Sequence, residues 1–79
     1  MKITVKLFGT LSRRFPDYRP AEGLEIELPE GATVKDLLAL LGISEPRGVV
    51  VIVEGRILKA DDQIRPGVPV NVLQTMHGG

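Results

Sequence analysis

The sequence predicts an α+β fold of two layers, in which one amphipathic helix covers one face of a mixed β-sheet. Three observations support this prediction. Segments near both ends alternate apolar and polar residues, one central segment has the periodicity of a helix, and a run of β-branched residues follows it. The length of 79 residues and the hydrophobic content of 43% suit one domain with one small core.

The first third of the chain predicts two strands joined by a loop. Residues 2–8, KITVKLF, alternate with the period of a half-buried strand. Residues 9–18, GTLSRRFPDY, begin at a glycine and contain Pro16, so a turn or a short helix is expected there. Alternation returns at residues 24–28, LEIEL, and stops at Pro29. We expect these two strands to form a hairpin.

The strongest single pattern is the helix expected within residues 31–42, GATVKDLLALLG. Thr33 and Asp36 have the spacing of a capping box, in which each side chain bonds the backbone N–H of the other residue. Gly42 stands where helices commonly end in a left-handed residue. One apolar stripe of helical spacing is expected to face the sheet, and it consists of Val34, Leu37, Leu38 and Leu41.

The second half of the chain predicts the remaining strands. Residues 49–53, VVVIV, form a continuous β-branched run that is typical of a central strand. The Glu-Gly pair at 54–55 indicates a tight turn into a short strand at 57–58. The final strand is expected at 68–75, where Pro69 faces away from a partner or marks an irregular start. Because the first and last strands are both strongly apolar, we expect them to be neighbours at the centre of a sheet of four to five strands.

The composition excludes several classes of function. Ten basic and ten acidic residues cancel, so the broad positive field of a nucleic-acid-binding protein is absent. The chain has no cysteine, and its single histidine, His77, cannot form a metal site alone. No apolar run approaches the roughly 20 residues of a membrane span, and the N-terminal residues alternate instead of forming a signal-peptide core. We therefore expect a cytoplasmic protein that binds neither membrane nor nucleic acid.

The sequence contains few side chains that could carry out catalysis. His77 is the only histidine, and no glycine-rich phosphate loop occurs, so neither a nucleophile–histidine pair nor a nucleotide site can be identified. Asp61 and Asp62 are adjacent in a loop, where their side chains point apart, and a solvated turn is the preferred interpretation. The chain is expected not to be an enzyme.

Two surface features could bind a partner. Leu73 has the parity of the sheet face that the helix leaves open, so it is either part of a binding surface or an isolated exposed residue. Phe8 has the same parity in the first strand, but a bulge that turns it into the core is the preferred interpretation. A local basic patch is either a solvated face, which is preferred, or a docking site for an acidic partner. It would consist of Lys6, Arg13, Arg14 and Arg19.

The C-terminal residues TMHGG come directly after the final strand and show no alternation. Glycine has no Cβ and the widest backbone freedom, so Gly78 and Gly79 could pass through a narrow channel or approach another backbone closely. A frayed terminus is the usual fate of chain ends and remains the alternative. The position just beyond the last strand favours a functional tail.

Four segments can be considered together: VKLFGTL at residues 5–11, LPEGATVKDLLALLG at 28–42, VIVEGRIL at 51–58, and the terminal Gly78-Gly79. In combination they resemble the MoaD/ThiS family of ubiquitin-like sulfur carrier proteins over nearly the whole chain. This resemblance implies a β-grasp fold for residues 1–75 and a flexible tail at 76–79.

The resemblance also implies a function. In this family an adenylating enzyme of the ubiquitin-activating type binds the carrier and receives its tail in the nucleotide site. The terminal carboxylate, here that of Gly79 with Gly78 as its required neighbour, is adenylated with ATP. A sulfur donor such as a cysteine desulfurase converts it to a thiocarboxylate, which supplies sulfide to a synthase subunit. The carrier is thus expected to bind no cofactor itself, since ATP is used by its partner.

The resemblance implies one residue that contacts partners, because Leu73 matches the apolar position on the last strand used for docking. Phe8, Thr75, Met76 and His77 are further candidates for partner contact, the last as a spacer in the tail. The chain has RPGVPV where relatives usually have a DGD-like turn, and QTMH where molybdopterin synthase small subunits have a PPV pattern. The recipient pathway therefore stays open between molybdopterin and thiamin thiazole formation. A protein modifier joined to lysines through Gly79 and a non-catalytic interaction module are the alternatives.

Overall fold

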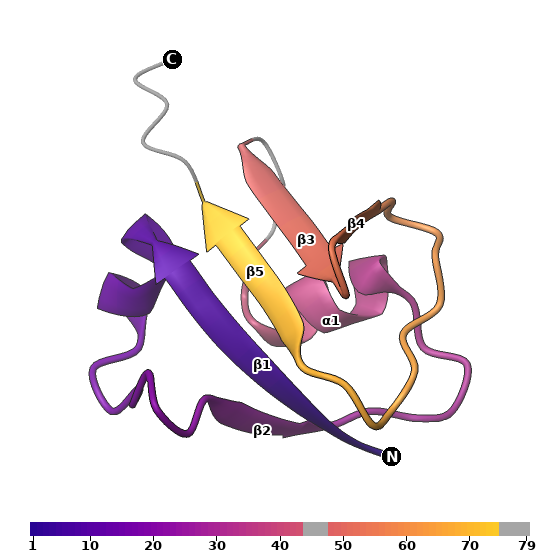
Figure 1. Ribbon diagram of the computed structural model, residues 1–79, viewed down its shortest axis with the longest axis horizontal. Helices are drawn as coiled ribbons and strands as arrows, with labels where there is room; N and C mark the ends of the chain where they lie inside the picture. The colour runs from indigo at the N-terminus through magenta and orange to yellow at the C-terminus, as the bar shows by residue number, and fades with distance from the viewer. Residues whose placement is uncertain (44–47, 75–79) are drawn as a thin grey trace.

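The computed structural model describes residues 1–43 and 48–74. The elements are β1 Lys2–Gly9, the 3₁₀ helix η1 Thr10–Arg14, β2 Leu24–Glu27, α1 Val34–Leu40, β3 Val49–Val53, β4 Arg56–Leu58 and β5 Val70–Gln74. The strands form one sheet in the order β2-β1-β5-β3-β4, and α1 lies behind this sheet in Figure 1. The predicted two-layer α+β architecture is confirmed. Within the described residues, no helix is long and apolar enough to span a membrane.

The sheet is mixed, because β1 and β5 run parallel while the other neighbouring strands run antiparallel. β5 occupies the centre, with β1 on one side and β3 on the other. The expected hairpin is the β1–β2 pair, and the expected contact between the first and last strands is the β1–β5 pair. Parallel neighbours need a long connection between them, and here that connection includes α1, which covers one face of the sheet.

The core lies between α1 and the sheet face that α1 covers. Ile3, Val5 and Leu7 of β1 point to this face and are almost fully buried, as are Val70 and Val72 of β5. The predicted stripe of the helix is buried against them, and it comprises Val34, Leu37, Leu38 and Leu41. Among the described residues no polar or charged side chain is buried, so apolar packing is the main source of stability.

Both ends of α1 are capped by the residues that the sequence indicates. The backbone N–H of Thr33 donates to Asp36 Oδ2 at 2.9 Å, and the N–H of Asp36 donates to Thr33 Oγ1 at 3.4 Å, so the capping box is complete. At the other end Gly42 has a φ of 78°, and its N–H donates to the carbonyl of Ala39. The N–H of Ile43 donates to the carbonyl of Leu38, which completes a Schellman motif.

The turn between β3 and β4 is also as predicted. Glu54 and Gly55 both have positive φ, at 51° and 78°, which is the requirement of a type I′ hairpin turn. The last strand is shorter than predicted, because β5 begins at Val70 and Pro69 lies just before it. Proline lacks the N–H that a ladder needs, which explains this late start.

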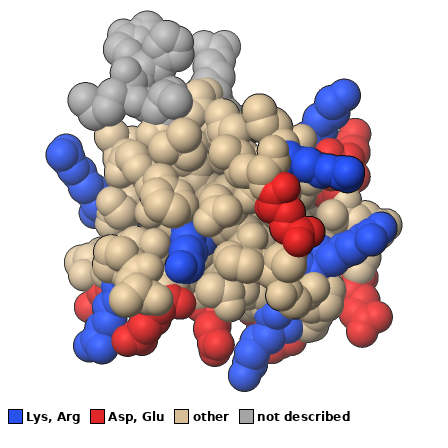
Figure 2. Space-filling view, viewed as in Figure 1, with Lys and Arg blue, Asp and Glu red and all other residues tan. Residues whose placement is uncertain are grey.

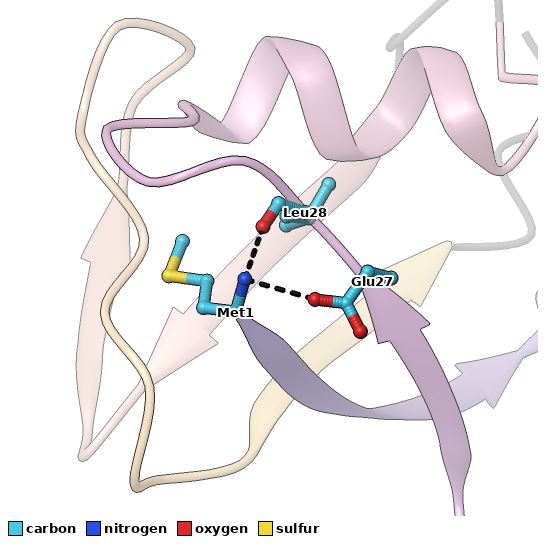
Figure 3. Close-up of polar contacts among 3 residues, drawn as sticks. All are labelled: Met1, Glu27 and Leu28. Atoms are coloured by element: carbon cyan, nitrogen blue, oxygen red, sulfur yellow. Dashed lines mark hydrogen bonds and ion pairs between the residues drawn. The ribbon is translucent and has the colours of Figure 1, made fainter.

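The N-terminus closes the β1–β2 hairpin (Figure 3). The Met1 ammonium donates to the carbonyl of Leu28 at 2.6 Å and forms an ion pair with Glu27 Oε2 at 3.0 Å. Further along β1, where β2 no longer runs beside it, the N–H of Leu7 donates to the hydroxyl of Tyr18 at 2.9 Å. The loop after η1 therefore supplies a hydrogen-bond acceptor to a backbone N–H of β1 at the part of its edge that β2 does not cover.

Candidate functional site at the open face of the sheet

Three apolar side chains lie in line across the open face, which is the sheet face that α1 does not cover. Phe8 of β1 is paired with Leu73 of β5, and Leu73 is paired on its other side with Val50 of β3. We call these three residues the apolar row. Phe8 is 45% exposed, and Leu73 and Val50 are partly buried. The row therefore presents apolar surface to solvent beside the end of β5.

The preferred prediction for Phe8, a bulge that turns it into the core, is wrong. β1 pairs with β5 without interruption from Val5 to Gly9, so no extra residue changes the alternation of side chains. Leu7 therefore points into the core and Phe8 points to the open face. Leu73 lies directly beside Phe8, so it is part of a continuous apolar surface and not an isolated exposed residue.

Sequence reasoning missed three residues of this face: Val50, Ile52 and Ile57. The run at 49–53 indicated a central strand, but the fold has helical cover on one face only, and only Val51 of this strand is fully buried. Ile52 is paired with Ile57 of β4, which is 70% exposed. The alternation of side chains along β3, together with a single helix in the sequence, was the signal that could have placed Val50 and Ile52 on the open face.

Charged side chains lie around the apolar row and not within it. Figure 2 shows an uncharged area on the open face over the ends of β1 and β5 and the start of β3, with Lys and Arg side chains at its margin. Arg14 donates to the carbonyl of Gly42 at 3.4 Å, and Arg19 forms an exposed ion pair with a glutamate three residues later at 3.6 Å. Lys6 and Arg13 have no salt bridge within the described ranges, so docking to an acidic partner surface stays a prediction for them.

The base of the C-terminal segment lies next to the apolar row. Gln74, the last residue of β5, is paired with Gly9, and its Oε1 accepts a hydrogen bond from Thr10 Oγ1 at 3.3 Å. The remaining candidate residues lie outside the described residues, and these are Thr75, Met76, His77, Gly78 and Gly79. Their roles stay predictions.

The structure brings together no catalytic group among the residues it describes. Asp61 and Asp62 are exposed, and Asp62 Oδ2 accepts the backbone N–H of Lys59 at 2.7 Å, as expected for a solvated turn. Across residues 1–43 and 48–74, no three His, Cys, Asp or Glu side chains gather into a group that could hold a metal ion.

The fold and its site define a class of protein. A mixed five-stranded sheet with one helix on one face, and with the last strand at its centre, is the ubiquitin-like β-grasp fold. The sequence matches the model of the ThiS family over residues 5–79, and the chain belongs to this family. The matched range includes Gly78 and Gly79. A search of curated protein sequences finds no significant match.

Solved structures show the same fold. A Pyrococcus furiosus protein assigned as molybdopterin converting factor subunit 1 is 27% identical, with a TM-score of 0.71, and the match covers 96% of this chain and 99% of that one. Two crystal structures of the small archaeal modifier protein SAMP1 from Haloferax volcanii each have a TM-score of 0.72. They are 17% and 20% identical, and the matches cover 95% and 100% of this chain and 98% and 100% of those chains. At this identity the likeness to SAMP1 concerns the fold alone.

Proposed function

We propose that this chain is a sulfur carrier whose reactive group is the C-terminal carboxylate of Gly79. The observation that carries the proposal is the ThiS family match, which continues from the β-grasp domain through Gly79. The central strand β5 ends at Gln74, so the C-terminal segment begins beside the apolar row. The likeness to the molybdopterin converting factor subunit supports molybdopterin formation as the recipient pathway, with thiazole formation as the alternative.

The proposed chemistry needs activation, because a carboxylate is a poor acyl donor. One carboxylate oxygen of Gly79 attacks the α-phosphorus of ATP, and pyrophosphate leaves to give an acyl-adenylate. Where the donor supplies hydrosulfide, it attacks the acyl carbon, and AMP leaves to give the thiocarboxylate. Where the donor is the persulfide of a cysteine desulfurase, its terminal sulfur attacks the acyl carbon and AMP leaves to give an acyl disulfide. A thiol then attacks the enzyme's sulfur of this disulfide, which releases the thiocarboxylate and leaves a disulfide on the donor. Gly78 and Gly79 add no side chain that would obstruct a closed active site. The chain acts as a co-substrate and not as an enzyme, and ATP binds to the partner.

The apolar row is the proposed docking surface for these partners. Exposed apolar side chains gathered on one face are typical of protein interfaces, and an aromatic residue such as Phe8 often contributes most of the binding energy. We expect an adenylating enzyme of the ubiquitin-activating type and a sulfur-accepting synthase subunit to contact Phe8 and Leu73. Thr75, Met76 and His77 would then contact the partner along the channel that receives the tail. The sulfur donor, such as a cysteine desulfurase, acts on the adenylated tail.

Intact-mass measurement tests the function. The chain is incubated with ATP, a sulfur source and a candidate adenylating enzyme. The expected result is a mass gain equal to the replacement of one oxygen by one sulfur. Deletion of Gly79 should abolish this gain and leave the melting temperature unchanged, because every core residue of the described part lies at or before Val72. Leu40→Ala, which alters an exposed helix residue, is the control that should still gain the mass.

Other outcomes would contradict the proposal. Covalent conjugates to lysines of other proteins, without a thiocarboxylate, would identify a protein modifier. An unchanged mass with every adenylating enzyme that binds the chain would identify a non-catalytic interaction module. Loss of folding on deletion of Gly79 would show that the terminal residue is part of the packed domain.

A further inference from the structure

The last residue pair of the β1–β5 ladder, Gly9 with Gln74, is packed more closely than a side chain would allow. A Cβ built on Gly9 would overlap the carbonyl oxygen of Gln74. It would also lie 3.2 Å from the carbonyl carbon of Gln74 and 3.2 Å from Cδ1 of Leu73. In addition, Gly9 has a φ of 67°, which L-residues with side chains rarely adopt. Position 9 therefore requires glycine for two independent reasons.

This combination is unlike that of the turn glycines. Positive φ with open space, where a Cβ would meet nothing within 4 Å, is found at Gly31, Gly42, Gly55 and Gly67. These four serve the local shape of turns and helix ends. Gly23 also lies close to another backbone, since a Cβ built on it would be 2.9 Å from the carbonyl oxygen of Val5, but Gly23 is in the loop that leads into β2. Gly9, by contrast, contacts the residue from which the C-terminal segment departs.

The residues after Gly9 restrain Gln74 as well, through a hydrogen bond to its side chain. Thr10 Oγ1 donates a hydrogen bond to Gln74 Oε1 at 3.3 Å. Ser12 Oγ donates to the carbonyl of Gly9 at 3.2 Å, and Leu11 is fully buried in the core. Because Leu11 ties η1 to the core, Gly9 and Thr10 are fixed with it. Gln74 is therefore restrained through both its backbone and its side chain.

The same ladder carries the apolar row. Phe8 pairs with Leu73, and the next pair along the strands is Gly9 with Gln74. We propose that Gly9 and Thr10 are positioning residues, which set the direction in which the C-terminal segment leaves the sheet relative to the apolar row. This inference rests on the proposed function, since a docked partner must receive the Gly79 carboxylate at one defined place. In such reactions a misplacement of about 1 Å can cost on the order of a hundredfold in rate.

Kinetics of tail adenylation test this inference. ATP–pyrophosphate exchange by the cognate adenylating enzyme gives kcat and KM for the full chain as the varied substrate. Gly9→Ala should lower kcat by about tenfold or more and change KM by less than about twofold, because the added Cβ overlaps the backbone of Gln74 but meets only the tip of the Leu73 side chain in the apolar row. Gly31→Ala is the matched control, because it imposes a similar backbone strain at a φ of 84° without any close contact. Equal kcat values for the two variants, or a loss confined to KM, would overturn the inference.

Thr10 provides a second variant that leaves the backbone at Gly9 unchanged. Thr10→Val removes the donor to Gln74 and should lower kcat by roughly threefold to tenfold, whereas Thr10→Ser keeps the hydroxyl and should restore it. These variants decide the question even if Gly9→Ala does not fold. If neither Gly9→Ala nor Thr10→Val changes kcat, Gly9 and Thr10 do not position the tail.

A structural measurement separates failure of this inference from failure of the proposed function. Residual dipolar couplings of the Leu73 and Gln74 amides, measured on the isotope-labelled full chain, report the orientation of this part of β5. They should change in Gly9→Ala and stay unchanged in Gly31→Ala. Unchanged couplings in Gly9→Ala would overturn the inference whatever the chemistry. If the wild-type chain is not adenylated by an enzyme that binds it, the proposed function fails, and the couplings alone show whether Gly9 orients Gln74.

Discussion

At the scale of single residues, the pairing of neighbouring strands decides which side chains are available for binding. Phe8 is as apolar as its buried neighbour Leu7, and it is exposed only because the β1–β5 ladder runs without a bulge through Gly9. The exposed position places an aromatic ring beside Leu73, at the end of the strand that leads to the tail. An aromatic residue in such a position has the character of an interface hot spot.

This exposure leads to a prediction for Phe8. Phe8→Ala should weaken binding of the adenylating enzyme by about 2 kcal/mol, which is roughly thirtyfold in Kd, with little change in the melting temperature. Calorimetric titration of the enzyme with each variant is the measurement. Leu40→Ala removes an apolar side chain that is 59% exposed on α1, away from the apolar row, and should bind like the wild type. Equal weakening by both variants would show that the apolar row is not the docking surface.

At the scale of elements, α1 depends on its caps and on the sheet. A helix of seven residues is too short to be stable alone in water. The capping box at Thr33 and Asp36 satisfies backbone N–H groups at its start, and the Schellman motif at Gly42 satisfies carbonyls at its end. Packing of its apolar stripe on the sheet supplies the rest of its stability.

The capping box can be tested by stability measurements. Thr33→Ala should lower the free energy of unfolding by about 1 kcal/mol, because the N–H of Asp36 loses its acceptor. Thr33→Ser keeps the hydroxyl and should lose only a small part of this stability. Urea denaturation at neutral pH is the measurement. If serine and alanine destabilise equally, the side-chain hydroxyl does not cap the helix.

At the scale of the whole molecule, the two faces of the sheet have different roles. One face packs against α1 and stabilises the fold, whereas the other is not covered by α1, carries Phe8, Leu73 and Ile57, and is the face on which we expect partners to dock. Because a single helix covers one face, substitutions on the two faces should have separable effects on stability and on binding.

A pair of leucines on α1 tests this division. Leu37 is fully buried and Leu40 is 59% exposed, so the same chemical change can be compared on the inner and outer sides of one helix. Leu37→Ala should destabilise the protein by about 2–5 kcal/mol, and Leu40→Ala by less than about 0.5 kcal/mol. Thermal and urea unfolding measure both. A similar loss for the two variants would mean that α1 does not pack as described.

Local patterns in the sequence were sufficient for most of the fold. The capping box, the end of the helix at Gly42 and the turn at 54–55 depend on residues within a few positions of each other, and all three are confirmed. The burial of Phe8 was predicted wrongly, and the position of Val50 and Ile52 on the open face was missed. Both depend on register and on which face the helix covers, and these are properties of distant segments.

The sequence by itself determined the class of fold, the apolar stripe of α1 that packs on the sheet and, through the family resemblance, the glycine carboxylate as the candidate reactive group. These conclusions rest on periodicity and on short motifs, which need no knowledge of long-range contacts. Only the tertiary structure decided that Phe8, Leu73 and Val50 stand in one line, and that Gly9 contacts Gln74. The physical reason is that both arrangements are made by β1 and β5, which are far apart in the chain and meet only through the parallel ladder at the centre of the sheet.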